Sequence, residues 1–78
     1  MDVKGMLIEI FRELKIDPSG VEAESRLRED LDIDSTEMVE IAVAIEKRMS
    51  VGVDTDDFLR LRTFGDIADY VSSARMAR

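Results

Sequence analysis

Three stretches of this chain repeat apolar residues at steps of three and four, which is the spacing of an amphipathic helix. They cover residues 3–15, residues 35–49 and residues 64 to about 74. No stretch alternates convincingly in steps of two, as a half-buried strand does. A chain of 78 residues buries a modest fraction of its surface, so its helices must share one compact core. The pattern therefore predicts an all-α bundle.

The connections between these stretches are unequal in length. Asp17-Pro18-Ser19-Gly20 is expected to end the first helix, because proline disfavours helical geometry in the residue before it. A long loop then covers residues 17–34, with a short helical turn expected around Ser25 to Asp30. A short third helix is expected over about 55–61, and Thr63-Phe64-Gly65-Asp66 has the form of a capping box for the last one. The expected architecture is three main helices, one short helix and a long loop between the first and second.

The net charge of the chain limits the classes of partner that it can be expected to bind. Eighteen acidic residues against 11 basic ones give a net charge of -7. Nucleic acid and anionic membrane surfaces are therefore disfavoured, since both attract Lys and Arg. Basic patches on other proteins are the natural partners. No signal peptide or membrane-spanning stretch is visible, so we expect a cytoplasmic protein that binds no membrane.

The absence of two residue types narrows the chemistry further. The chain has no cysteine and no histidine. Disulfides, thiolate metal sites, cysteine nucleophiles and Ser-His-Asp triads are excluded. No nucleophile–base pair is recognisable, so we expect a protein that is not an enzyme.

The segment Asp34-Ser35 stands where the second helical stretch begins. Asp34 is expected to cap the helix, with Glu37 three residues on in a near capping-box arrangement. A serine at this junction exposes its hydroxyl beside the free N–H groups of a helix start, which can accommodate a phosphodiester. The other interpretation is that Ser35 is only part of an ordinary helix cap.

A wider pattern surrounds this serine. It reads Leu27-Arg28-Glu29-Asp30-Leu31-Asp32-Ile33-Asp34-Ser35 and later Thr63-Phe64-Gly65-Asp66-Ile67-Ala68-Asp69-Tyr70-Val71. Together with size and acidity, this resembles the acyl carrier protein family over nearly the whole chain. The resemblance implies a small four-helix acyl-carrier bundle, with a single acyl carrier domain over residues 1–78. It also implies a 4′-phosphopantetheine arm, donated by coenzyme A, on Ser35.

The same resemblance implies how such a carrier works with its partners. A phosphopantetheinyl transferase would install the arm, helped by Asp34, and the arm would carry acyl groups as thioesters. Acyl-loading and acyl-processing enzymes such as a ketosynthase or an acyltransferase would dock on the second helix of a monomeric carrier. The matching docking positions are Thr36, Glu37, Glu40, Val43 and Glu46.

Several positions depart from the family's common pattern. Thr36 stands where leucine is common, and Asp32 where glycine often precedes the serine. Lys47 and Arg48 make the far end of the docking face mixed in sign. These departures favour a polyketide or other specialised pathway over fatty acid synthesis. An aminoacyl or peptidyl carrier, or an unmodified helical module for protein interactions, are the alternatives.

Two further patterns in the sequence concern a cargo pocket and a metal site. An apolar cargo could be sheltered between the helices, as bundle pockets often are. The candidate lining residues are Val39, Ala42, Ile45, Phe58, Ile67 and Ala68. Asp30, Asp32 and Asp34 also alternate like the start of a calcium loop. However, Ser35 takes the place of the required glycine and Ile41 that of the final glutamate, so no metal site is expected.

Overall fold

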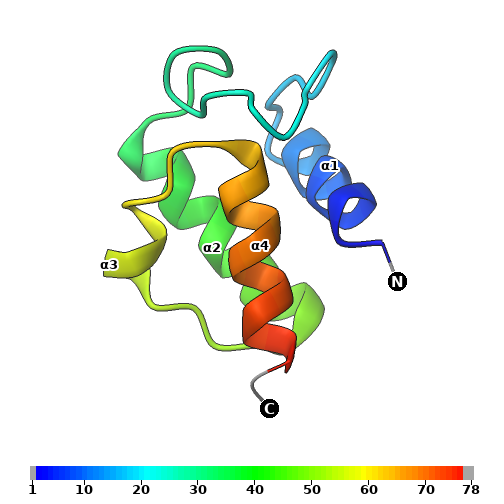
Figure 1. Cartoon of the computed structure of the whole chain (residues 1–78), viewed down its shortest axis with the longest axis vertical. Helices are drawn as coiled ribbons and strands as arrows, with labels where there is room; N and C mark the ends of the chain where they lie inside the picture. The colour runs from blue at the N-terminus through cyan, green and yellow to red at the C-terminus, as the bar shows by residue number, and fades with distance from the viewer. Residues whose placement is uncertain (1, 77–78) are drawn as a thin grey trace.

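The computed structural model describes the backbone of residues 2–76 and the side chains of residues 2–74. Within that range the helices are α1 (Val3–Glu13), α2 (Ser35–Met49), α3 (Thr55–Phe58) and α4 (Phe64–Met76). Figure 1 shows α1, α2 and α4 packed together, α3 beside α2, and the long loop over one end of the bundle. The predicted all-α bundle of three main helices, one short helix and one long loop is confirmed.

α1 ends at Glu13, two residues earlier than the spacing predicts, because Lys15 adopts a left-handed conformation with φ 64°. The N–H of Lys15 donates to the carbonyl of Arg12 at 3.1 Å, and that of Ile16 to the carbonyl of Phe11 at 2.8 Å. This pair of bonds is a Schellman motif, which satisfies the last carbonyls of a helix. The motif stops α1 before the proline that was expected to end it, and it turns Ile16 into the core.

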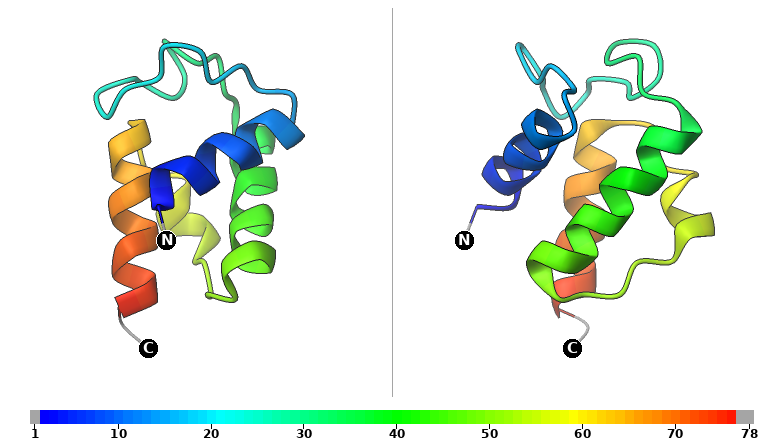
Figure 2. Two further views of the ribbon diagram at one scale, coloured as in Figure 1. Left: turned by 90° about the vertical axis from the view of Figure 1, so that its right-hand side faces the viewer. Right: turned by 180° about the vertical axis from the view of Figure 1, so that it is seen from behind.

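The core lies where α1 crosses between α2 and α4, as the left view of Figure 2 shows. Phe11 of α1 and Phe64 of α4 meet edge to face, with ring centroids 5.7 Å apart. Phe58 of α3 and Tyr70 of α4 meet in the same way at 5.9 Å. No polar side chain is buried in the described part of the chain. None of the helices described is long and apolar enough to cross a bilayer.

The buried face of α2 differs from the expectation in one respect. Met38, Ile41 and Ile45 are buried, and Ala42 lies with them. Val39, expected among the residues lining an interior pocket, is instead 39% exposed. The reason is the register, because residues at steps of three and four from Met38 define the buried stripe and Val39 lies one position beside it. The other five candidate lining residues pack into the core.

The long loop is fastened to the start of α4 by backbone hydrogen bonds. The N–H of Leu27 donates to the carbonyl of Arg62 at 2.8 Å, and that of Phe64 to the carbonyl of Ser25 at 2.9 Å. Arg26 forms an isolated antiparallel bridge with Thr63 between these bonds. Within the loop, the N–H of Asp30 donates to the carbonyl of Arg26 at 2.9 Å, which closes the expected helical turn. The loop thus has a fixed course as it approaches Ser35.

The course of the chain between α3 and α4 is set by the backbone hydrogen bonds to the long loop. α3 ends at Phe58, earlier than the predicted 55–61, because the next residues leave the helix to bring Arg62 beside the loop. The N–H of Asp66 then donates to Thr63 Oγ1 at 3.1 Å, and the N–H of Thr63 donates to Asp66 Oδ2 at 3.2 Å. The predicted capping box at the start of α4 is confirmed.

Candidate functional site

The start of α2 is held by a complete capping box. Asp34, in extended geometry, accepts a hydrogen bond from the Glu37 N–H at 2.9 Å, and its own N–H donates to Glu37 Oε1 at 3.2 Å. Each carboxylate satisfies one backbone donor, so the first turn is rigid without help from a partner. Both acids also suit the positive end of the helix dipole. The predicted capping role of Asp34 is confirmed.

Ser35 is the first residue of α2 and its side chain is exposed. Its Oγ accepts a hydrogen bond from Arg28 Nη2 at 3.3 Å. The hydroxyl therefore belongs to the first residue of a helix and accepts a bond from a guanidinium, and both the positive helix end and the guanidinium favour a negatively charged group. This set of donors fits a phosphodiester on Oγ.

The predicted docking residues of α2 fall into two groups. Thr36, Glu40 and Val43 are exposed, and Val43 is 41% accessible to solvent. Glu37 is half-buried and engaged in the capping box. Glu46 is exposed, and its Oε2 accepts a hydrogen bond from the Val53 N–H at 3.0 Å. The carboxylates of Glu37 and Glu46 thus each also bind a backbone N–H group and hold it in place.

An apolar strip accompanies the exposed docking residues. Val39 and Val43 lie one turn apart on α2 and line a shallow groove of about 350 Å³. Leu14, at the end of α1, forms the other side of this groove. Glu40 and Lys47 also line it, so an apolar strip lies between an acid and a base. Large apolar side chains exposed in a row are typical of protein contacts.

Arg48 does not share this face, although the sequence placed it at the end of the docking surface. Its guanidinium forms ion pairs with Glu9, at 3.5 Å, and with Glu13. Both carboxylates belong to α1. Arg48 therefore joins α1 to α2, and Lys47 is the base that remains beside the apolar groove.

The aspartates that resemble the start of a calcium loop act separately. Asp30 accepts a hydrogen bond from the Arg26 N–H at 2.8 Å, and Asp34 caps α2. Asp32 adopts a left-handed conformation with φ 56°, which glycine adopts more readily than other residues. Among the described residues, no group of three acidic side chains is arranged to hold a metal ion.

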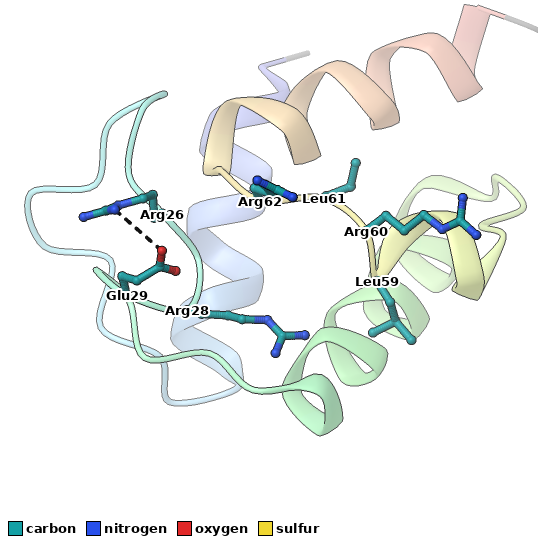
Figure 3. Close-up of a pocket in the computed structure, with 7 residues that line it drawn as sticks. All are labelled: Arg26, Arg28, Glu29, Leu59, Arg60, Leu61 and Arg62. Atoms are coloured by element: carbon teal, nitrogen blue, oxygen red, sulfur yellow. Dashed lines mark ion pairs between the residues drawn. The ribbon is translucent and has the colours of Figure 1, made fainter.

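An arginine-lined depression lies near the start of α2, and it was not predicted from the sequence. It has a volume of about 500 Å³ and lies between the long loop and the connection from α3 to α4, as Figure 3 shows. The residues that line it are Arg26, Arg28, Glu29, Leu59, Arg60, Leu61 and Arg62. The tripeptide Arg-Leu-Arg occurs in both segments, at residues 26–28 and 60–62, and this repeat is the signal that could have revealed it.

Comparisons with known proteins find relatives of this chain in sequence and in structure. The family model described as a phosphopantetheine attachment site matches residues 7–71, a span that includes Ser35. An acyl carrier protein from Acidothermus cellulolyticus is 39% identical over 72 residues, which are 91% of this chain and 86% of that protein. A meromycolate extension acyl carrier protein from Mycolicibacterium aurum is 46% identical over 66 residues, 83% of this chain and 68% of that protein.

A solved structure shares the fold. It is the 3,7-dioxo-octyl actinorhodin acyl carrier protein from Streptomyces coelicolor, which superposes with a TM-score of 0.75 at 28% identity. The match covers 97% of this chain and 88% of the other. The arrangement of helices around the start of α2 therefore has a counterpart among solved structures.

Proposed function

Because this chain belongs to the acyl carrier protein family, whose members bear a covalent 4′-phosphopantetheine, we propose that Ser35 is the residue that carries this arm. The protein is then a carrier of acyl groups and not an enzyme. The observation that carries the assignment is the exposed Ser35 hydroxyl at the first residue of α2. Its donors, the helix start and Arg28, suit the phosphodiester that attachment would create.

Ser35 takes part in attachment as a passive acceptor. A bond forms between Ser35 Oγ and the phosphorus that bears the pantetheine in coenzyme A. The bond from that phosphorus to the bridging oxygen of the diphosphate breaks, the nucleotide half leaves with that oxygen, and the serine proton passes to the transferase. The chain has no histidine to act as a general base, and we assign activation of the hydroxyl to the transferase. When bound, the arm supplies the thiol that the cysteine-free chain lacks, and that thiol holds the acyl group as a thioester.

Asp34 has a double role in this proposal. Its Oδ1 accepts the Glu37 N–H, which leaves the rest of the carboxylate at the surface beside Ser35. From there it would help the transferase and its metal ion to engage. The capping bond holds this carboxylate in place at the residue before the serine.

The docking face consists of the exposed side of α2. Thr36, Glu40 and Val43 are its accessible members, and Val39 extends its apolar strip. Acidic side chains on the same face as an apolar strip suit enzymes that present a basic patch beside an apolar contact. Glu37 and Glu46 belong to this face too, although each also binds a backbone N–H. The transferase, an acyltransferase and a ketosynthase would use this face in turn, on a monomeric cytoplasmic carrier.

A polyketide or other specialised pathway is the better match for this docking face. Thr36 offers a smaller apolar contact than leucine would, and Lys47 breaks the acidic run beside the groove. Such differences exclude partners that require the usual contacts. Transferring acyl groups from matched ketosynthases of both pathways to the loaded protein tests this choice. Faster transfer with a fatty acid ketosynthase would contradict it.

The attachment is tested by intact mass. The wild type, Ser35→Ala and Ser73→Ala are incubated with coenzyme A, magnesium and a broad-specificity phosphopantetheinyl transferase. Ser73 is an exposed serine of α4 and so serves as the matched control. We expect one added phosphopantetheine on the wild type and on Ser73→Ala, and none on Ser35→Ala.

Three other results would point to a different attachment site or a different function. A gain on Ser35→Ala would move the attachment site to another residue. No gain on any variant, with a transferase that modifies a reference carrier in the same tube, would favour an unmodified interaction module. Loading by an adenylating enzyme with an amino acid, rather than with an acyl group, would identify an aminoacyl or peptidyl carrier.

A further inference from the structure

The arginine-lined depression concentrates positive charge on an acidic protein. Four of the 11 Lys and Arg residues line it, although the chain has a net charge of -7. Backbone hydrogen bonding between Leu27 and Arg62, at 2.8 Å, holds its two sides together. The two backbone segments that carry these arginines are therefore held side by side by the fold.

The arginines differ in whether their charge is already neutralised. Arg26 forms ion pairs with Glu29 at 3.6 Å and with Asp30 at 3.7 Å. Within the described part of the chain, Arg28, Arg60 and Arg62 form no ion pair with a carboxylate. Figure 3 shows Arg28 reaching from the loop toward the start of α2, with Arg62 across the depression from it. Positive charge is thus available on the side nearest Ser35.

Arg28 already contacts the atom to which the arm would be attached. Its Nη2 donates to Ser35 Oγ at 3.3 Å. A phosphoryl group on that oxygen places its non-bridging oxygens two bonds beyond Oγ, within reach of the same guanidinium. Guanidinium groups bind phosphate with two parallel hydrogen bonds, which an ammonium cannot do. The carboxylates of Asp34 and Glu37, beside Ser35, repel the same negative charge.

We propose that Arg28 binds the phosphodiester of the arm on Ser35 and directs the arm into the arginine-lined depression. Leu59 and Leu61 line this depression with the arginines and offer apolar surface to the arm. The arm then lies on the side of α3 and leaves the apolar strip of Val39 and Val43 open to partners. The inference rests on the proposed attachment at Ser35.

The first test uses wild-type protein before and after attachment of the arm. The guanidinium NMR signals of Arg28 and of Arg12 are compared, and each is assigned from the spectrum of the corresponding Arg→Gln variant without the arm. Arg12 is an exposed arginine of α1 and serves as the control. We expect the Arg28 signal to shift on attachment and the Arg12 signal to stay. An unchanged Arg28 signal would overturn the proposal and leave the arginines to an acidic partner surface.

The second test follows the phosphorus itself. In the loaded protein we expect the ³¹P shift to differ from that of a free pantetheine phosphodiester and to approach it as salt is raised. Arg28→Gln should give the free value and lose nuclear Overhauser contacts between the arm and Leu59 or Leu61, whereas Arg12→Gln should keep both. Arg28→Lys should fall between them. Equal spectra for Arg28→Gln and wild type would refute the role of Arg28, although the mass gain would still support attachment. If wild type gains no mass, both proposals fail together.

Discussion

The N–H of Gly65 donates to the carbonyl of Ala23 at 2.9 Å, and no side chain fits at residue 65 beside that contact. A Cβ on Gly65 would lie 2.9 Å from the Ala23 oxygen and 3.2 Å from the Ala23 Cβ. The bond joins the first half of the long loop to the start of α4. The loop that carries Arg28 toward Ser35 therefore depends on a glycine in another element.

Replacing this glycine should loosen the loop. We expect Gly65→Ala to lower the free energy of unfolding by about 1–3 kcal/mol, because the methyl group forces backbone apart. Gly52→Ala is the matched control, since a Cβ there meets nothing within 4 Å. Its effect should stay within about 1 kcal/mol. Urea unfolding followed by circular dichroism measures both, and equal stabilities would contradict the close contact.

Features that depend on residues close together in the sequence were predicted, and features that depend on the pairing of distant segments were missed. Helix periodicity and caps such as Asp34 and Thr63 depend on residues within four positions of one another, and these predictions were confirmed. The buried face of α2 was placed partly wrong because Val39 and Met38 are adjacent, and both fit a helical stripe. The arginine-lined depression needs two distant segments to pair, and the bond from Leu27 to Arg62 that pairs them leaves no periodic signal.

A substitution at the end of α1 should stabilise the folded protein. Lys15 holds a φ of 64° as the left-handed residue of the Schellman motif, a conformation that costs a non-glycine residue roughly 1 kcal/mol. We expect Lys15→Gly to raise the free energy of unfolding by about 0.5–1 kcal/mol. Lys4→Gly, inside α1, should instead lower it by about 1 kcal/mol. A loss of stability in Lys15→Gly would show that the lysine has a role beyond this turn.

Substitutions of Asp34 should separate its structural role in the capping box from its role in recognition by the transferase. We expect Asp34→Ala to lower the free energy of unfolding by about 1 kcal/mol, because the Glu37 N–H loses its acceptor. Asp34→Asn keeps an acceptor oxygen and should keep most of the stability, while it removes the charge beside Ser35. If the transferase uses that charge, its kcat/KM should fall with both variants. A normal kcat/KM for Asp34→Asn would limit Asp34 to capping.

The carboxyl group of Asp17, at the start of the long loop, accepts a local hydrogen bond. The Ser19 N–H donates to Asp17 Oδ1 at 2.9 Å, and this hydrogen bond lowers the pKa of the Asp17 carboxyl. A carboxyl with a lowered pKa in the folded state adds stability at neutral pH, and this contribution is lost as pH falls through the folded pKa. Carbon NMR should show Asp17 titrating at lower pH in folded protein than in denaturant. Equal midpoints would mean that the bond is absent in solution.

The apolar strip of α2 should matter for partners and hardly for the fold. Val43 is 41% exposed, so Val43→Asp should change the free energy of unfolding by no more than about 0.5 kcal/mol. A carboxylate there would be desolvated in any complex that covers the strip, and loss of one central contact typically costs more than about 1 kcal/mol of binding. We therefore expect kcat/KM for acyl transfer to this carrier to fall roughly tenfold. Ser73→Asp adds the same charge on α4 and should leave the rate unchanged. Equal rates for both variants would place the docking surface elsewhere, with the arginine-lined depression as the next face to test.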